Sequence, residues 1–360
     1  SGVWIMAYTT IDKPSDYFNT VLWTGNGSQR TITVGFQPDF SWLKNRGTVD
    51  WHKLSDSVRG ANKVVASNAN NAEGTETQKL QSFVSTGFTI GTDGEVNGNG
   101  SSQVAWNWKA GTSFTNDASS TGIGTIDSTG SVSTTAGFSI MTYTGTGSNG
   151  TVAHGLSAVP NMYIVKKRNA TSQWYTYHSA NTSAPETEYL DLESTAATSD
   201  SDVNWNDTAP TSTTFSLGTN SNVNNNGNTY VAYVFAEKQG YSKFESYVGN
   251  GNADGTFVYT GFKPAFVMFK KSSATGNWFM MNNKMFPANG INASGGDQKY
   301  LFANTSNNEQ GGYGQTDILS NGFKLRGSDG DLNGSGVTYI YMAFAENPFT
   351  TSTGVPATAR

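Results

Sequence analysis

The sequence has no cysteine, which excludes disulfides, thiolate catalysis and cysteine-ligated zinc. Histidine is scarce, because only His52, His154 and His178 are present and none has a metal-ligating partner two or four positions further on. Charged residues make up 14 % of the chain, against about 25 % in typical soluble domains. The formal net charge of −5 does not suit a nucleic-acid binder, which clusters Lys and Arg to neutralise phosphates. No apolar run approaches the roughly 18 residues of a membrane span, and no secretory signal is visible.

Glycine and aromatic residues are abundant instead, with 41 Gly and 12 % Phe, Trp and Tyr among 360 residues. Low charge with many aromatics and turn formers favours twisted β-structure. The runs "VAYVFA" (231–236) and "IYMAFA" (340–345) are typical of strands buried on both faces, whereas "TITVGF" (31–36) alternates. A helical apolar period of 3.6 residues persists nowhere over three turns. The sequence therefore predicts an all-β protein with almost no helix.

Three copies of one unit follow each other along the chain. Each copy begins with a Gly-x-Gly turn and continues with a Pro that precedes a Lys by six positions; a Trp follows the Lys. The first turn glycines are Gly25, Gly145 and Gly249, the prolines are Pro38, Pro160 and Pro264, and the lysines are Lys44, Lys166 and Lys270. Chance does not produce three ordered sets of landmarks, so each copy is predicted to be one domain.

Each copy is about 100 residues long and is predicted to form a β-sandwich. A single closed array such as a propeller is the alternative, but a propeller blade needs only about 40–50 residues. The Ser/Thr/Gly-rich stretch between the first two copies is interpreted as a linker or a loose edge segment, so the first domain is expected to be oriented more freely. Residues 1–5 are interpreted as foreign to, or upstream of, the natural start, since Met6 begins a start-like stretch. The expected organisation is an N-terminal arm (1–17), repeat 1 (18–110), the linker (111–135), repeat 2 (136–238), repeat 3 (243–347) and a C-terminal tail (348–360).

A loop rich in Asp, Asn and Gly recurs in every copy, and in "GSDGDLNGSG" (327–336) it has the order with which a calcium loop opens. The bidentate Glu that would complete an EF-type site is missing, and the second copy, with Asn220, Asn222 and Asn224, has no carboxylate. A hairpin turn explains all three copies, because Asn, Asp and Gly tolerate positive φ. No cofactor is therefore expected; weak calcium binding is the alternative for two copies. Its ligands would be Asp93, Glu95 and Asn97 in the first copy and Asp329, Asp331 and Asn333 in the third.

Two further sets of repeated residues have a structural and a functional interpretation. Trp51, Trp174 and Trp278 follow the lysine strand, where packing in a core is favoured and a stacking platform for sugar rings is the alternative. The three repeated lysines are expected to extend from a sheet rim, with a salt bridge to another protomer as the alternative.

Four carboxylates in "APETEYLDLES" (184–194) offer the acid pair that a glycosidase needs. They are Glu186, Glu188, Asp191 and Glu193. The other copies carry mostly amides at this place, so a solvated strand edge is favoured. No nucleophile elbow can be placed either. The sequence predicts a protein that is not an enzyme.

The stretches "MAYTTIDKPSDYF" (6–18), "VNGNGSSQVAWNWK" (96–109) and "GVPATAR" (354–360) resemble a group of marine bacteriophage proteins of the cyanophage and pelagiphage type. These are described as hypothetical, tail-fibre or virion structural proteins. The resemblance implies lectin-like or laminin-G-like sandwiches. It carries no catalytic residue over to this chain.

The expected function is that of a virion structural or adhesive protein, either a tail fibre or a surface decoration, that acts through multivalent contacts. The expected location is the surface of a virus particle. Expected partners are further copies of the chain, with a trimer preferred, other virion proteins and a host surface glycan, but no nucleic acid and no membrane. A free carbohydrate-binding protein with a sugar pocket in each repeat is the alternative.

Overall fold

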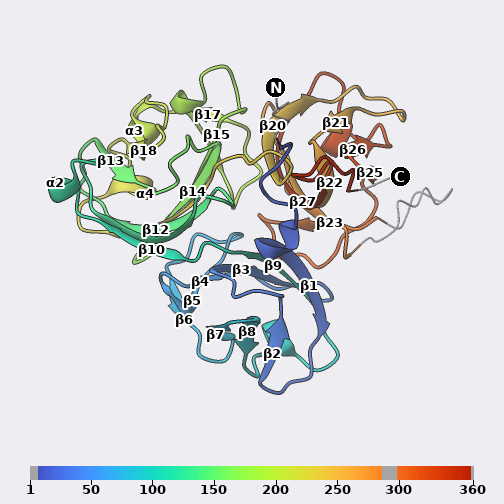
Figure 1. Cartoon of the computed structure of the whole chain (residues 1–360), viewed down its shortest axis with the longest axis horizontal. Coiled ribbons are helices and arrows are strands. Elements are labelled where there is room, and N and C mark those ends of the chain that lie inside the picture. Colours follow the sequence, from blue (N-terminus) through green and yellow to red (C-terminus); the bar gives the residue numbers. More distant parts are fainter. Residues whose placement is uncertain (1–6, 286–297, 358–360) are drawn as a thin grey trace, which may run out of the picture.

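The computed structural model describes residues 7–285 and 298–357, and these form three β-sandwich domains grouped around a common centre (Figure 1). Every described helix spans three or four residues. The predicted all-β fold with almost no helix is confirmed. In the part of the chain that the structure describes, no helix is long and apolar enough to cross a membrane.

Domain 1 (18–108) pairs a six-stranded inner sheet, in the order β1-β9-β3-β4-β5-β6, with a three-stranded outer sheet, β2-β8-β7. The inner strands are β1 (Phe18–Thr24), β9 (Ser102–Trp108), β3 (Phe40–Asn45), β4 (Lys53–Asp56), β5 (Gly60–Val65) and β6 (Gly74–Thr75). The outer strands are β2 (Arg30–Thr33), β8 (Gly87–Ile90) and β7 (Leu80–Val84). The short helix α1 (Gly94–Asn97) connects the outer sheet to the inner one, and the 3-10 turn η1 (Pro14–Asp16) precedes β1.

Domain 2 (112–235) has an eight-stranded inner sheet, β10-β11-β12-β19-β14-β15-β16-β17, and an outer pair, β13-β18. The inner strands are β10 (Thr112–Asn116), β11 (Ser128–Ser133), β12 (Phe138–Thr144), β19 (Thr229–Phe235), β14 (Met162–Lys167), β15 (Trp174–His178), β16 (Glu188–Asp191) and β17 (Ser199–Asp200). The outer strands are β13 (Gly150–Ala153) and β18 (Thr214–Leu217). The short helical turns are α2 (Ala118–Thr121), η2 (Pro185–Thr187), α3 (Asp202–Trp205) and α4 (Ser221–Asn224).

Domain 3 (242–348) repeats the arrangement with a five-stranded inner sheet, β20-β27-β22-β23-β24, and an outer sheet, β21-β26-β25. The inner strands are β20 (Ser242–Val248), β27 (Thr338–Pro348), β22 (Phe262–Lys271), β23 (Trp278–Asn282) and β24 (Leu301–Phe302). The outer strands are β21 (Phe257–Tyr259), β26 (Gly322–Leu325) and β25 (Thr316–Leu319), and α5 (Gly330–Asn333) links the two sheets. The strand order shows that β1, β12 and β20 are equivalent, as are β9, β19 and β27.

The inner sheets are buried on both faces, which explains their continuous apolar runs. One face packs on the outer sheet of the same domain, and the other face packs against the inner sheets of the two neighbouring domains. Aromatic pairs cross the domain boundaries, such as Phe40 with Tyr233 at 4.3 Å and Phe18 with Phe344 at 5.0 Å between ring centroids. The repeats predict separate sandwiches, but a fourth, shared core joins the three domains at the centre of the molecule.

The stretch 111–135 is not a linker. It provides β10 and β11, which pair with β12 and extend the inner sheet of domain 2 as its edge, so the edge interpretation holds. The polar composition of the stretch fits a sheet edge, where one strand has no further neighbour. The expectation that domain 1 is oriented freely is also wrong, because its inner sheet is part of the shared core.

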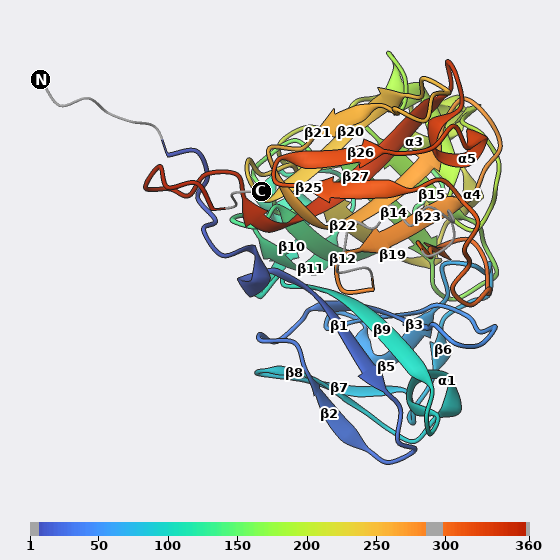
Figure 2. The same cartoon turned by 90° about the vertical axis from the view of Figure 1, so that its right-hand side faces the viewer.

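The molecule has two distinct ends. Figure 2 shows α1, α4 and α5 at one end, and the described parts of the N-terminal arm (7–17) and of the C-terminal tail (349–357) at the other. At the chain-end side, Tyr8 donates to the carbonyl of Gly261 at 2.7 Å, and the hydroxyl of Ser352 donates to Asp12 at 2.5 Å. The arm before β1 and the tail after β27 are thus bound to each other and to domain 3.

Candidate functional site

The three repeated lysines lie inside the molecule, not at a sheet rim. Each ammonium group donates to a backbone carbonyl of the neighbouring domain. Lys44 of domain 1 bonds Ser306 in domain 3 at 3.2 Å, Lys166 of domain 2 bonds Asn70 in domain 1 at 3.0 Å, and Lys270 of domain 3 bonds Thr195 in domain 2 at 3.0 Å. Burial lowers the pKa of all three lysines to about 8.

Backbone amides join the same acceptors. The N–H groups of Asp50, Ser172 and Gly276, each six positions after its lysine, donate to these same carbonyls at 2.8, 2.8 and 2.9 Å. Each carbonyl therefore receives an ammonium and an amide donor from one neighbour.

The ring nitrogen eight positions after each lysine completes the contact. Trp174 donates to the carbonyl of Ala66 at 2.9 Å, and Trp278 donates to that of Asp191 at 2.9 Å. In domain 1 the same place holds His52, whose Nε2 lies 3.0 Å from the carbonyl of Phe302. The sequence alignment placed Trp51 in this set, but it is one position too early. The three acceptors Ala66, Asp191 and Phe302 each stand four positions before the carbonyl that binds the lysine.

These contacts form a closed ring, in which domain 1 donates to domain 3, domain 3 to domain 2, and domain 2 to domain 1. We call this set of residues the domain ring. Head-to-tail contacts that close on themselves are the geometry of a cyclic trimer. Here one chain builds it from three copies of its own sequence unit.

Burial decides between the two interpretations of the repeated tryptophans. Trp174 is 0 % exposed and Trp278 is 2 % exposed, so neither indole is accessible to a sugar ring. Their packing in the shared core explains why they recur. Trp51 is 45 % exposed and lies outside the ring, so the stacking prediction remains for this residue alone.

A buried ion network reinforces the contact between domains 1 and 2. Arg59 Nε lies 2.5 Å from Asp56 and its Nη1 lies 2.9 Å from Glu73, while Arg168 of domain 2 reaches Glu73 at 3.0 Å. The hydroxyl of Tyr233, also in domain 2, donates to Asp56 at 2.8 Å. The two arginines balance the two carboxylates, as a buried network requires. No sequence pattern indicated this network.

The carboxylates at the end of β16 (Asp191) and just after it (Glu193) are not a solvated edge. Glu193 accepts the backbone N–H of Trp174 at 3.0 Å, at a place where Asn68 and Asn304 accept the corresponding N–H groups in the other domains. Burial raises the pKa of Asp191 to about 6 and that of Glu193 to about 7. Asp191 belongs to the domain ring through its carbonyl, and Glu193 binds the backbone of Trp174 within domain 2, so the prediction of a solvated edge is wrong for both.

The recurring Asp/Asn loops are the helical turns α1, α4 and α5, which carry the chain from the outer to the inner sheet. They are not hairpin turns, and their last residue is a buried asparagine: Asn97, Asn224 and Asn333. The side-chain NH2 group of each asparagine donates to one backbone carbonyl just before its own helical turn and to another at the end of the Gly-x-Gly segment. The side-chain oxygen of each asparagine accepts a backbone N–H of the Gly-x-Gly segment at 2.8–3.1 Å. The recurrence of the loop thus has a structural cause, since the asparagine joins two turns.

The same contact explains the first glycines of the Gly-x-Gly turns. A Cβ atom on Gly25, Gly145 or Gly249 would lie 2.1, 2.4 or 2.3 Å from the carbonyl oxygen that follows the buried asparagine in the other turn. Only glycine permits this close approach of two backbones.

The proposed calcium ligands do not converge on one point. Asp93 and Asp329 accept the N–H groups of Glu95 and Asp331 at 2.8 and 2.6 Å, which is the role of a helix cap. Glu95 pairs with two lysines, and Asp331 pairs with Lys271 at 2.8 Å. Among the described residues, no group of three or more His, Asp or Glu side chains is arranged to hold a metal ion.

A surface cluster in domain 1 brings together Trp51 and the charged residues of the first loop. Lys53 Nζ lies 5.5 Å from the centre of the Trp51 ring and 2.9 Å from Glu95, and Lys79 lies 2.7 Å from Glu95. Asp50 lies 3.8 Å from Lys53. We call Asp50, Trp51, Lys53, Lys79 and Glu95 the Trp51 cluster. Its lysines carried no signal in the sequence.

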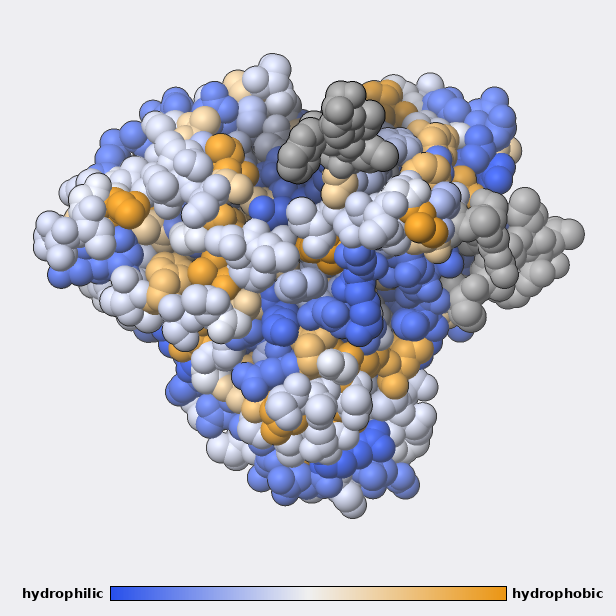
Figure 3. Space-filling view, viewed as in Figure 1, coloured by the Kyte–Doolittle hydropathy of each residue, from blue (hydrophilic) through white to orange (hydrophobic). Residues whose placement is uncertain are grey.

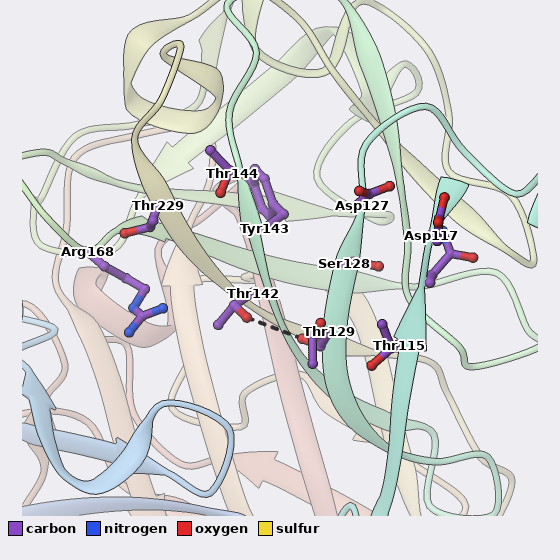
Figure 4. Close-up of a pocket in the computed structure, with 11 residues that line it drawn as sticks. Thr115, Asp117, Asp127, Ser128, Thr129, Thr142, Tyr143, Thr144, Arg168 and Thr229 are labelled. Atoms are coloured by element: carbon purple, nitrogen blue, oxygen red, sulfur yellow. Dashed lines mark hydrogen bonds between the residues drawn. The ribbon is translucent and has the colours of Figure 1, made fainter. Parts of the chain in front are cut away.

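A hollow of about 350 Å³ lies on the inner sheet of domain 2 beside its edge strands (Figure 4). Threonines of β10, β11 and β12 line it on one side, and Arg168 stands across from them. Its charged groups already have partners, since Asp117 caps α2 and Asp127 accepts the N–H of Ala118 at 2.9 Å. A second hollow, of about 610 Å³, lies between domains 2 and 3 and is lined by small polar side chains and Glu188. Such hydroxyl-rich hollows suit polar ligands.

The outer surface shows no large apolar area on the side seen in Figure 3, where hydrophobic residues form small separate groups among polar ones. A family model described as "Domain of unknown function (DUF7483)" matches residues 13–348. The match spans all three domains and the whole domain ring. None of the curated proteins matches the chain.

Proposed function

The chain belongs to the DUF7483 family, and we propose that it is a non-enzymatic structural and adhesive protein of a virus particle, either a tail fibre or a surface decoration. The observation that carries the proposal is the domain ring. The lysines, backbone amides and ring nitrogens that recur in the three repeats join the domains, and they do so through buried contacts that leave no room for a ligand.

A body held in this way suits a role in assembly. Three inner sheets share one core, and each boundary between domains has ammonium, amide and ring N–H donors bonded to carbonyls. Domain movements are the ordinary expectation for polar interfaces within a chain, and large apolar contact suppresses them. The molecule is therefore proposed to act as one rigid unit that presents its loops to a partner.

The two ends of the molecule support a division of roles. The described arm (7–17) and tail (349–357), which contact each other, lie at one end, and the loops with α1, α4 and α5 lie at the other (Figure 2). A protein that is fixed at one end presents the other to a partner or host surface. We propose that the loop end is the contact surface.

The resemblance of the sequence to marine phage proteins supports the location on a virus particle. Immunogold labelling of purified particles with an antibody against this chain tests it directly. Label on tails or capsids is expected. A chain that is absent from particles and occurs only as free protein contradicts the proposal.

Self-association is a further part of the proposal. The preferred homotrimer follows the analogy with fibres, and because the internal ring lies within one chain, further copies would meet through the outer surfaces. Light scattering coupled to gel filtration, measured from micromolar concentration upward, determines whether the chain forms a closed oligomer. A monomer throughout this range would restrict the proposed contacts to other virion proteins.

A free carbohydrate-binding protein is the second candidate, and the exposed indole of Trp51 is the observation that favours it. This candidate no longer requires one sugar site per repeat, since Trp174 and Trp278 are buried. Tight binding of one glycan by a protein that never occurs on particles would favour it over the virion role.

The proposal that the protein is not an enzyme has its own test. Polysaccharide turnover that is abolished by Glu186→Gln or Glu188→Gln would contradict it.

A further inference from the structure

One surface corner differs in chemistry between the domains although the backbone around it is the same. Two of its residues flank the ring-nitrogen residue (His52, Trp174 or Trp278) in the sequence, one on each side. The third is the second residue of the helical turn α1, α4 or α5. These are Trp51, Lys53 and Glu95 in domain 1, Gln173, Tyr175 and Asn222 in domain 2, and Asn277, Phe279 and Asp331 in domain 3.

The other two domains close this corner without an exposed aromatic ring beside buried charges. In domain 2, the amide of Asn222 donates to Gln173 at 3.3 Å and to the Tyr175 hydroxyl at 3.1 Å. In domain 3, Phe279 packs against Tyr313 with ring centroids 5.1 Å apart. Domain 3 also places an ion pair here, because Asp331 lies 2.8 Å from Lys271, whose side chain is 14 % exposed. What domain 1 adds at this corner is an exposed indole, a second lysine and a second carboxylate.

Domain 1 holds the two lysines of this corner in nearly complete burial. The side chains of Lys53 and Lys79 are only 7 % and 10 % exposed, and both bind the carboxylate of Glu95, which is 40 % exposed. Charges removed from water cost free energy even when they are paired. Such an arrangement in a partly open place is typical of a site that binds something.

A second carboxylate makes the cluster more unusual. Burial and the neighbouring charge of Glu95 raise the pKa of Asp50 to about 6. Burial opposes ionisation of Glu95 as well, but hydrogen bonds from Lys79 and Lys53 lower its pKa to about 2. Two carboxylates and two ammonium groups thus form a fixed set of hydrogen-bond acceptors and donors directly beside the indole.

These groups match the surface of a sugar ring. A pyranose has an apolar C–H face that packs on an indole, and its rim carries hydroxyls that both donate and accept hydrogen bonds. Exposed Trp51 offers the flat surface, Glu95 offers an acceptor, and the lysines offer donors. Fixed polar groups next to an aromatic surface are the usual composition of a small-ligand site.

We propose that the Trp51 cluster is a binding site for a pyranose residue of a glycan. The sugar stacks on the indole of Trp51 and directs its hydroxyls to Glu95 and to the two lysines. The inference rests on the proposed adhesive function and names its ligand class. It assigns the site to domain 1 alone, so each chain carries one such site.

The test uses the full chain and four probes: the methyl pyranosides of glucose, galactose and mannose, and N-acetylglucosamine. Saturation-transfer NMR detects binding at millimolar concentration, and tryptophan fluorescence gives the affinity. At least one probe is expected to bind, with the strongest transfer to protons of its apolar face. Trp51→Ala is expected to weaken binding at least about tenfold, and Trp51→Tyr, which retains a flat ring, to weaken it much less.

Gln173→Ala is the matched control, because it changes the corresponding position in domain 2 and should leave binding unaltered. Glu95→Gln removes the charge at the rim and is expected to weaken binding several-fold. Melting temperatures of Trp51→Ala and wild type should agree, since the indole is largely outside the core.

Absence of transfer to all four probes would overturn the proposal, and so would binding that Trp51→Ala leaves unchanged. Neither result affects the immunogold test, so a failed sugar site remains distinguishable from a failed virion role. Binding that is lost equally in Gln173→Ala and Trp51→Ala would also overturn the assignment to domain 1.

Discussion

The position that ends β4, β15 and β23 shows how the three domains differ while their backbones agree. It holds Asp56 in domain 1, His178 in domain 2 and Asn282 in domain 3, each opposite an equivalent strand residue. All three side chains accept backbone N–H groups from the turn that follows, at 2.8–3.2 Å. The local role is constant, because every domain must close this turn.

The contact with the neighbouring domain is not constant. Asp56 enters the charged network with Arg59 and Tyr233, whereas His178 stays neutral and places Nε2 3.1 Å from the carbonyl of Tyr341 in domain 3. One boundary thus depends on paired charge and the next on an uncharged imidazole. The three repeats share the contacts that form the ring and differ in the residues beside it, and the following experiments separate the two boundaries.

Removal of Arg59 from the charged boundary between domains 1 and 2 should cause the largest loss in the free energy of unfolding. Arg59→Met leaves Asp56 buried without its partner, and removal of one member of a buried pair costs about 3–5 kcal/mol. Urea unfolding should show this loss in the free energy of unfolding at pH 7. Arg168→Met, at the exposed side of the same network, is the control and should cost about 1 kcal/mol. Equal losses in both variants would contradict the importance of burial.

The neutral boundary should respond to acid instead. Burial lowers the pKa of His178 to about 4, below the ordinary value of 6.5. The unfolded chain therefore takes up a proton before the folded chain does, and stability falls as the pH drops from 6.5 to 4, by about 3 kcal/mol for this residue. His178→Gln should weaken this dependence in pH-resolved urea unfolding. A slope identical to that of wild type would contradict the neutral imidazole.

Glu193 should make stability depend on pH in the opposite direction from His178, and the change in the free energy of unfolding should be smaller. Its pKa of about 7 lies above the ordinary value of 4.5, so the folded chain holds a proton that the unfolded chain releases. Its contribution is fully present below pH 4.5 and is lost as the pH rises to 7 and beyond. Glu193→Gln imitates the amides of Asn68 and Asn304 and should raise stability at pH 8 by about 1–3 kcal/mol. A variant that is less stable than wild type at pH 8 would show that the charged form is preferred.

The sequence predicted the fold class and the three repeats because both follow from local patterns. Continuous apolar runs such as 231–236 indicate a strand that is buried on both faces. The glycines at 25, 145 and 249 indicate places where two backbone segments lie very close together. What covers the second face of an inner sheet is a question of packing between distant segments, and the run itself does not answer it. The shared core was missed for this reason.

The positions predicted for the repeated lysines and tryptophans were wrong for a similar reason, since they too depend on contacts between distant segments. The lysines and tryptophans were recognised, but composition cannot distinguish a rim from a domain boundary. Trp51 was aligned with Trp174 although the register of β3 and β4 places His52 there. The Trp51 cluster joins residues around 51, 79 and 95, and only the folded chain brings these together.

The smallest expected change in stability distinguishes two interpretations of the recurring loop, a capped turn and a calcium site. Domain 2 caps this turn with Asn220, whose oxygen accepts the N–H of Asn222 at 2.8 Å, just as Asp93 accepts that of Glu95 in domain 1. Asn and Asp are about equal as helix caps, whereas Ala costs about 1 kcal/mol at this position. Asp93→Asn should therefore leave the melting temperature within about 1 °C of wild type, and Asp93→Ala should lower it by a few degrees, with or without millimolar calcium. If calcium raises the melting temperature of wild type and Asp93→Asn removes that increase, the loop is a metal site after all, because an amide keeps the cap but gives up the carboxylate charge that a hard cation requires.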